Sequence, residues 1–209
     1  IDPIHSTTIY ISGNNSGVFK SKDGGRTWQP VNRGLCNYRV GSLAMHPNDS
    51  QILFAATQGG IFKSTDAAAT WKPKREGFPK ITQEYKKIQY DDCVSVAVNP
   101  FQPDMVFAGC GGSTRFIERT RLLVPGYKSF DEGETWTPLT SGNGGPEVGK
   151  PLTVTGFAFQ GKDRVLMASN QGLFRSDNAG RSWQRIGQDG IAEDFITKVA
   201  CPQVEPKTI

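Results

Sequence analysis

Two irregular segments, residues 74–92 and 111–127, combine aromatic, basic and acidic side chains. Loops that are held on a rigid scaffold commonly use such groups to bind ligands. We therefore predict a binding surface formed by Tyr85, Tyr90, Arg115, Arg119, Arg121 and Tyr127. The alternative interpretation is that both segments are solvated loops without a ligand.

The same segments contain carboxylates that could hydrolyse a glycosidic bond. Such hydrolysis needs two carboxyl groups that face each other across a sugar, about 5–5.5 Å apart for retention or about 6.5–9.5 Å for inversion. Asp92 and Glu118 are the candidates for this pair, because both lie in the longest of four repeats. Asp91 is not expected to act with Asp92, since adjacent residues of a strand point to opposite sides. These carboxylates leave open whether the chain is an enzyme.

The elements that must position these groups belong to a repeat that uses every tryptophan of the chain. The repeat is an octapeptide that ends in Trp, and its copies occupy residues 21–28, 64–71, 129–136 and 176–183. The copies start 43, 65 and 47 residues apart. A four-stranded propeller blade has about 40–50 residues, so one copy is enlarged. Short β-type runs precede the octapeptides, for example residues 8–12 and 17–20, so we expect four strands per repeat, named a to d.

The octapeptide resembles the Asp-box, or bacterial neuraminidase (BNR), repeat, whose pattern Ser-x-Asp-x-Gly-x-Thr-Trp forms a hairpin between strands c and d. This resemblance covers nearly the whole chain and implies an all-β fold, a β-propeller of four-stranded antiparallel blades. We expect about four blades in a single propeller region over residues 1–209. The repeat occurs in sialidases, xyloglucanases, sortilin-type receptors and photosystem assembly factors, so it leaves the activity open. The Arg-Ile-Pro motif of sialidases does not occur in the sequence.

The residues of the octapeptide are predicted to be structural. Aspartate or asparagine can accept main-chain N–H bonds in the turn, glycine supplies a positive φ, and the tryptophan should be buried between blades. The predicted structural residues are Ser21, Asp23, Gly25, Trp28, Ser64, Asp66, Trp71, Ser129, Asp131, Gly133, Trp136, Ser176, Asn178, Gly180 and Trp183. Ala68 replaces the glycine of the second copy, where a positive φ would cost about 1 kcal/mol. The second hairpin is therefore the doubtful one.

No metal or cofactor is predicted. Each octapeptide has one or two carboxylates, whereas calcium takes about 6–8 oxygen ligands, and no Cys and His spacing suggests a zinc site. The formal charge of +4 is spread along the chain without a run of like charges, which argues against nucleic-acid binding. No apolar stretch approaches the roughly 20 residues of a membrane helix.

Consecutive antiparallel strands alternate in direction, so strand parity (the position of a strand in the order a to d) assigns the connecting loops to two faces. The a-to-b and c-to-d turns share one face, here called the octapeptide face, and the b-to-c and d-to-a connections share the other. Both irregular segments belong to this second face, here called the insertion face. Cys93 and Cys110 would lie directly opposite each other if Val98 pairs with Met105, so a disulfide is possible there. Only the family resemblance favours an extracellular or periplasmic location.

The two ends of the chain repeat each other. Residues 201–209 are similar to residues 2–9, and residues 195–200 have the pattern of a strand a. This last strand could complete the first blade and close a ring of four blades. The alternative, which we favour, is a segment of a larger propeller whose remaining blades belong to a longer parent chain.

Our main functional hypothesis is a propeller module that acts as a binding scaffold for protein or carbohydrate through the insertion face. The first alternative is part of a secreted glycoside hydrolase, similar to a xyloglucanase or a sialidase. The second alternative is a purely structural repeat array.

Overall fold

The computed structural model describes residues 1–78, 81–82, 88–89, 92–111, 126–139, 153–187, 189–191 and 195–201. Every regular element in these ranges is a β-strand. Strands that follow one another in sequence pair in antiparallel order, and they form one three-stranded and three four-stranded sheets. The four sheets are the blades of a propeller-type fold, as the repeat predicts.

Each blade consists of consecutive strands. Blade 1 comprises β1 (Ile9–Gly13), β2 (Gly17–Ser21) and β3 (Gln29–Pro30). Blade 2 comprises β4 (Val40–His46), β5 (Asp49–Thr57), β6 (Gly60–Ser64) and β7 (Lys72–Lys74). Blade 3 comprises β10 (Cys93–Val98), β11 (Val106–Cys110), β12 (Gly126–Ser129) and β13 (Thr137–Pro138). Blade 4 comprises β14 (Val154–Phe159), β15 (Val165–Ser169), β16 (Gly172–Ser176) and β17 (Gln184–Ile186). A separate pair, β8 (Ile81–Thr82) and β9 (Ile88–Gln89), lies between blades 2 and 3 in sequence.

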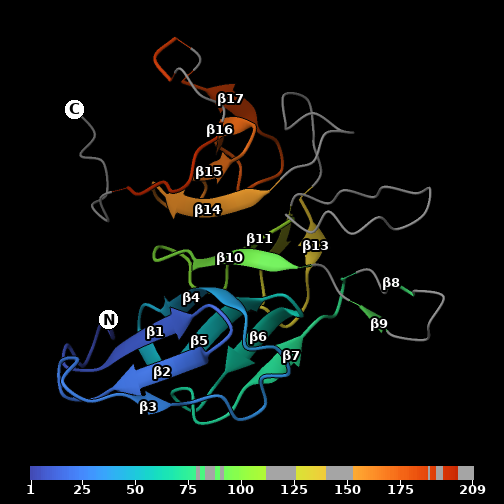
Figure 1. Cartoon of the computed structure of the whole chain (residues 1–209). Helices are drawn as coiled ribbons and strands as arrows, with labels where there is room; N and C mark the ends of the chain where they lie inside the picture. Colours follow the sequence, from blue (N-terminus) through green and yellow to red (C-terminus); the bar gives the residue numbers. More distant parts are fainter. Residues whose placement is uncertain are drawn as a thin grey trace.

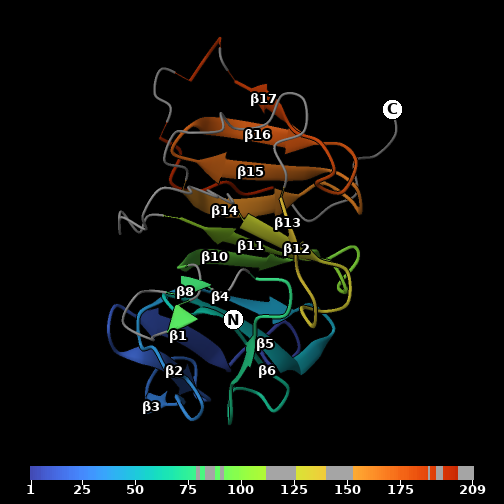
Figure 2. The same ribbon diagram turned by 90° about the vertical axis from the view of Figure 1, so that its right-hand side faces the viewer.

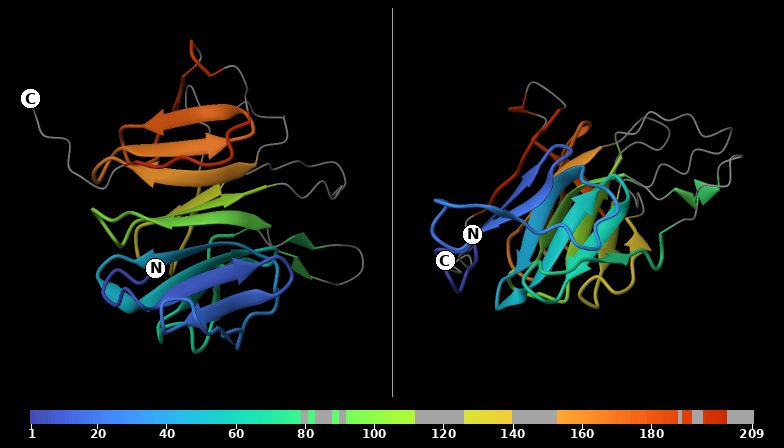
Figure 3. Two further views of the ribbon diagram at one scale, coloured as in Figure 1. Left: turned by 60° about the vertical axis from the view of Figure 1, so that its left-hand side comes forward. Right: turned by 60° about the horizontal axis from the view of Figure 1, so that its bottom comes forward.

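The blades stack in chain order, so that blade 1 and blade 4 lie at opposite ends of the arc (Figures 1 and 2). The same order is visible from two further sides (Figure 3). Residues 195–200 do not pair with β1, because the main-chain N–H of Ile196 donates to the carbonyl of Ser169 in blade 4, at 2.9 Å. The closed ring of four blades that the sequence allowed is therefore wrong, and the described blades form an open arc.

The four octapeptides form one kind of hairpin, held by its own side chains. The serine hydroxyl accepts the main-chain N–H four residues on, for example from Gly25 to Ser21 at 2.8 Å. It donates to the aspartate, which in turn accepts the N–H and the hydroxyl of the threonine, as Asp23 does from Thr27 at 2.9 and 2.6 Å. These bonds satisfy the polar groups of a tight turn without any ligand.

The two deviating hairpins keep this structure. Ala68 has φ +67° and its N–H reaches Ser64 at 2.9 Å, so alanine adopts the conformation that glycine has elsewhere. Asn178 accepts the N–H of Ser182 at 2.9 Å, and its amide donates to that serine hydroxyl at 2.8 Å. The doubt about the second hairpin was therefore unfounded.

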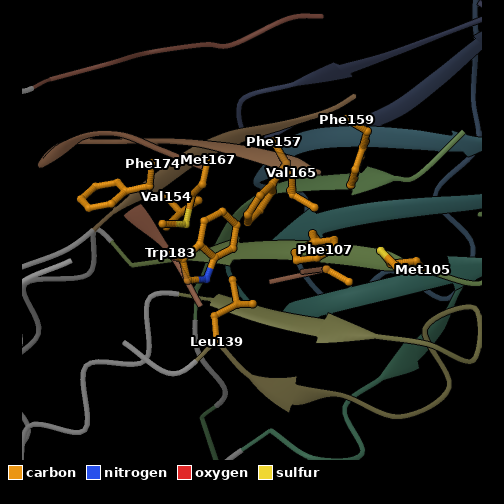
Figure 4. Packing of buried hydrophobic residues seen from close by; sticks show 11 residues of the cluster. Met105, Phe107, Leu139, Val154, Phe157, Phe159, Val165, Met167, Phe174 and Trp183 are labelled. Carbon is orange, nitrogen blue, oxygen red and sulfur yellow. The ribbon is translucent and has the colours of Figure 1, made fainter. Parts of the chain in front are cut away.

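The core lies between the blades rather than inside them. Three apolar clusters fill the three junctions, and each includes the octapeptide tryptophan of the following blade. At the last junction the Trp183 ring lies among Leu139, Phe107, Val165 and Met167 (Figure 4). Trp71, Trp136 and Trp183 are thus each covered by the blade that precedes them in the sequence.

Trp28 is the exception to the prediction that the four tryptophans are equally buried. Trp71, Trp136 and Trp183 are 2%, 2% and 3% exposed, whereas Trp28 is 36% exposed. Its indole N–H donates to the carbonyl of Gly25 in its own hairpin, while the indole of Trp71 reaches Val31 of the preceding blade at 2.8 Å. The difference arises because no described blade precedes blade 1.

Main-chain hydrogen bonds also connect neighbouring blades at these junctions. The N–H of Trp71 donates to Arg33 at 2.8 Å, and the N–H of Trp136 donates to Glu76 at 2.9 Å. Glycine follows the acceptor in both cases, and a Cβ on Gly77 would lie 1.8 Å from the carbonyl oxygen of Trp136. Glycine is needed here because the blades meet backbone to backbone.

A buried carboxylate adds a further link between blades 1 and 2. Asp2 accepts the main-chain N–H of Ile4 and His5 at 2.8 and 3.0 Å, and the Ser50 hydroxyl of blade 2 at 2.6 Å. Burial opposes its ionisation, but these hydrogen bonds outweigh burial and lower the pKa of Asp2 to about 2. Asn99 makes the equivalent link between blades 3 and 4, to the carbonyl of Lys162 at 3.0 Å.

We predict that Gly77→Ala destabilises the fold far more than Gly24→Ala. Both positions have positive φ, at which alanine costs about 1–2 kcal/mol. At Gly77 the added methyl group also clashes with main-chain atoms, and such overpacking lowers the free energy of unfolding by about a further 1–3 kcal/mol. At Gly24 no atom lies close enough to clash. Urea unfolding should give a total loss of about 2–5 kcal/mol for Gly77→Ala, and equal losses for both variants would contradict the junction geometry.

The second prediction concerns acid. Because the folded pKa of Asp2 lies below its ordinary value, the ionised form stabilises the fold above about pH 4, and this contribution disappears as the pH falls towards 2. Asp2→Asn should therefore lower the free energy of unfolding at pH 5 and above, with a difference from the wild type that shrinks towards pH 2. Asp189→Asn, in an exposed turn, serves as control. A pH-independent difference would show that ionisation of Asp2 is not the cause.

Candidate functional site

The predicted ligand-binding residues lie mainly outside the described residues. Tyr85, Tyr90, Arg115, Arg119, Arg121 and the carboxylate candidate Glu118 belong to this group. Their grouping on the insertion face stays a prediction. The described residues do show where both irregular segments join the blades, because residues 74–78, 92–93, 110–111 and 126–127 are placed.

Tyr127 is a core residue and not a surface ligand contact. Its side chain has 0% exposure, and its ring stacks on Phe78 with centroids 4.0 Å apart. Phe78 also meets the ring edge of Trp136 at 5.8 Å. Tyr127 occupies the strand c position of Phe62 and Phe174, which are likewise buried. The predicted binding role of Tyr127 is therefore wrong. The register of its strand points the side chain into the junction between blades 2 and 3.

Asp92 lies at the base of the two segments. It is half-buried and directly precedes β10, and its carbonyl accepts the N–H of Gly111 at 3.0 Å. The end of the first segment and the start of the second are therefore hydrogen-bonded neighbours on blade 3.

A disulfide reinforces this base. Cys93 lies directly opposite Cys110 on the neighbouring strand, and the structure bonds their sulphur atoms. The register differs from the expected one, since Val98 pairs with Val106 and not with Met105. A shift in the ladder between Cys93 and Ser95 compensates by one residue and returns the two cysteines to opposite positions. Both cysteines are buried, so the link is part of the core.

Blades 1 and 2 contribute a cationic and aromatic rim that the sequence analysis missed. Tyr38 is 50% exposed, and Arg39 donates through Nε to Asn14 at 3.2 Å. The Arg75 guanidinium lies 5.3 Å from the Phe62 ring and donates through Nε to the Gly59 carbonyl at 3.0 Å. These residues belong to d-to-a connections, which strand parity assigns to the insertion face. The position of these residues between a strand d and the next strand a was the signal in the sequence that could have identified them.

The octapeptide carboxylates are engaged in structure. Hydrogen bonds from Thr27 and Ser21 lower the pKa of Asp23 to about 2. For Asp131, burial opposes ionisation, but bonds from Ser129 and Thr135 lower its pKa overall. Carboxylates whose pKa is lowered and that are bonded within their own hairpin are poorly suited to donate a proton as a general acid.

The octapeptide face of blade 4 is also hollowed among the described residues. A shallow depression on blade 4 is lined by Gln160, Lys162, Asp163, Arg164 and Asp177. Asp177 is bound there by Arg164 at 2.6 Å and by Arg175 at 3.0 Å, and the hydrogen bond from Arg164 is the main cause of its lowered pKa. In the part of the chain that the structure describes, no group of three or more His, Cys, Asp and Glu side chains could hold a metal ion. The same residues include no helix that is long and apolar enough to cross a membrane.

We predict that the Cys93–Cys110 bond contributes about 2–4 kcal/mol to stability, as is typical of a native disulfide. The double variant Cys93→Ala/Cys110→Ala should lose this amount in urea unfolding, and a reducing agent should lower the wild type but not the variant. Cys36→Ser removes an exposed free thiol and is the matched control. A wild-type stability that does not respond to the reductant would contradict the assignment.

Comparison with known proteins identifies the fold. No protein-family model and no curated protein matches the sequence. An ancestral GH74 enzyme matches with TM-score 0.75 and 24% identity, over 93% of this chain and 24% of that one. The GH74 xyloglucanase from Xanthomonas campestris matches with TM-score 0.63 and 15% identity, over 92% of this chain and 30% of the enzyme.

A third solved structure is the extracellular domain of a proposed one-component system from B. thetaiotaomicron. It matches with TM-score 0.64 and 12% identity, over 92% of this chain and 23% of that one. The chain therefore spans less than a third of the length of these three structures. Identities this low show a shared fold, an all-β propeller arrangement with four blades in this chain.

Proposed function

We propose that the chain is an Asp-box repeat module that serves as a binding scaffold for a protein or a glycan through its insertion face. The observation that carries this proposal is that the ends of both long segments are bonded to each other where they join blade 3. The Cys93–Cys110 bond and the Gly111 to Asp92 hydrogen bond hold the base of both long segments to one rigid sheet. A rigid base lowers the entropy that two long loops lose when they bind a ligand.

The chemistry of the face favours a polar ligand with flat apolar surfaces. The segments supply tyrosine and arginine, and Tyr38 with Arg39 extends the same composition over blades 1 and 2. Aromatic rings present large contact area at low conformational cost, and arginine presents a planar set of donors. Sugars and peptide chains both offer surfaces of this kind.

The alternative is part of a secreted glycoside hydrolase. The similarity of fold to GH74 enzymes favours it, and Asp92 would then be one catalytic carboxylate, with Glu118 or a carboxylate outside this chain as the second. A purely structural array is the further alternative, in which neither face binds a ligand.

The proposal includes an exported protein. A buried disulfide fits an oxidising compartment, extracellular or periplasmic. The partners are then a protein or carbohydrate ligand and the remaining blades of a longer parent chain. The formal charge of +4 is spread along the chain without a run of like charges, which argues against nucleic acid as the partner.

Xyloglucan oligosaccharides are the first probe, because one structural neighbour is a xyloglucanase. We expect saturable binding in calorimetry without release of new reducing ends. Tyr85→Ala and Tyr90→Ala should each weaken binding about tenfold, the equivalent of about 1.4 kcal/mol. The control Phe130→Ala removes an exposed aromatic ring from the octapeptide face and should leave affinity unchanged. Release of reducing ends that Asp92→Asn abolishes would instead establish the hydrolase.

A further inference from the structure

The connection between β3 and β4 presents charged and aromatic side chains on the insertion face. Within residues 31–39, the side chains of Arg33, Tyr38 and Arg39 are exposed, and Tyr38 has 50% exposure. This stretch contains no aspartate or glutamate. The turn between β1 and β2 and the turn between β5 and β6 contain none either. These segments therefore combine positive charge and an aromatic ring without a carboxylate of their own.

Main-chain hydrogen bonds hold this connection to both blades. The N–H of Gly17, at the start of β2, donates to the carbonyl of Tyr38 at 2.9 Å. The N–H of Gln58, in the turn after β5, donates to the carbonyl of Arg39 at 3.2 Å. The N–H of Arg39 in turn donates to the Asn37 side chain at 2.9 Å. Tyr38 and Arg39 thus project from a backbone that is already fixed, which lowers the entropy lost when a ligand binds.

The guanidinium of Arg39 is oriented but not neutralised. Its Nε donates to Oδ1 of Asn14, in the turn between β1 and β2, at 3.2 Å. In the part of the chain that the structure describes, Arg39 forms no ion pair. A guanidinium has five N–H donors, and the bond to Asn14 uses one of them. Arg39 therefore offers a held positive charge with donors that a ligand can use.

A second guanidinium lies against the same connection. Arg75, from the connection after β7, donates through Nε to the carbonyl of Gly59 at 3.0 Å. Its Nη2 lies 3.5 Å from Sγ of Cys36, within the connection between β3 and β4. The carboxylate that follows in the sequence, Glu76, is exposed, and its main chain joins blade 3 by accepting the N–H of Trp136. Arg75 thus adds positive charge beside residues 36–39.

The chemistry of these groups selects one class of ligand. An arginine presents a planar pair of donors that matches the two oxygens of a carboxylate. An exposed tyrosine ring presents a flat apolar face that can stack on the flat face of a sugar ring. A sugar ring that carries a carboxylate satisfies Tyr38 and Arg39 together. The acidic side chains of a peptide supply the carboxylate but no rigid ring, so the combination favours an acidic glycan.

We propose that Arg33, Tyr38 and Arg39, here called the β3–β4 surface, bind an acidic glycan, a chain of sugar rings that carry carboxylate groups. This inference rests on the proposed function, since it names the ligand class for one part of the insertion face. Tyr38 stacks on a sugar ring and Arg39 pairs with its carboxylate, while Arg33 adds positive charge on the same connection. Because these groups are exposed, their attraction to the ligand weakens as the salt concentration rises.

Calorimetry of the whole chain with oligogalacturonate tests the ligand class. We expect saturable binding that weakens at higher salt and is lost when the carboxylates of the same oligosaccharide are methyl-esterified. Equal binding of poly-glutamate would overturn the proposal, because the surface would then recognise acid groups without a sugar ring. If xyloglucan oligosaccharides bind and oligogalacturonate does not, this inference is wrong while the proposed function stands. If neither binds, the inference and the glycan form of the proposed function both fail.

Variants of the β3–β4 surface test the site. Arg39→Gln should weaken oligogalacturonate binding at least about tenfold, because it removes the guanidinium that pairs with a carboxylate. Tyr38→Ala should weaken it about five- to tenfold, whereas Tyr38→Phe keeps the ring and should bind like the wild type. The control Arg26→Gln removes the same charge from the octapeptide face of blade 1 and should leave the affinity unchanged. Equal losses in Arg39→Gln and Arg26→Gln would overturn the proposal, because net charge alone would then explain binding.

Discussion

The burial of each octapeptide tryptophan by the preceding blade is the interaction on which the rest of the structure depends. A hairpin of two short strands cannot bury a tryptophan by itself, and the three covered rings lie in the clusters that fill the junctions. The dependence has a direction along the chain. Every blade stabilises the hairpin of the next one, so stability is a sum over neighbouring junctions, as in other repeat proteins.

This arrangement explains why the polar side chains of the octapeptides are occupied by hydrogen bonds within their own hairpins. The serine, aspartate and threonine satisfy one another and the turn, and the lowered pKa of Asp23 and Asp131 reflects that engagement. The opposite face is less constrained, because the residues that hold the next tryptophan lie close after strand d, as Arg33 does for Trp71 and Glu76 for Trp136. Long segments can therefore be inserted there at little cost, and the Cys93–Cys110 bond fixes the place from which they depart.

Repeat spacing was enough to predict the blades and the hairpins. Exposure of single residues was harder to predict, because it depends on what lies across a junction. Tyr127 looks like a loop tyrosine in the sequence, yet register places it in the core beside Phe78. Trp28 repeats the other tryptophans in sequence but has no described blade in front of it. The Cys93–Cys110 pairing was expected from a strand register that was wrong by one residue. An irregularity in the ladder, which the residue pattern does not reveal, nevertheless brings the two cysteines opposite each other.

Hydrogen exchange of the four indole N–H groups, followed by NMR in dilute solution, tests the directional burial most directly. The account predicts slow exchange for Trp71, Trp136 and Trp183, which the preceding blade covers, and fast exchange for Trp28. Uniformly fast exchange would mean that the junctions are not packed as described. Protection of Trp28 equal to that of the other three, in a chain shown to be monomeric, would contradict the claim that the preceding blade provides the cover.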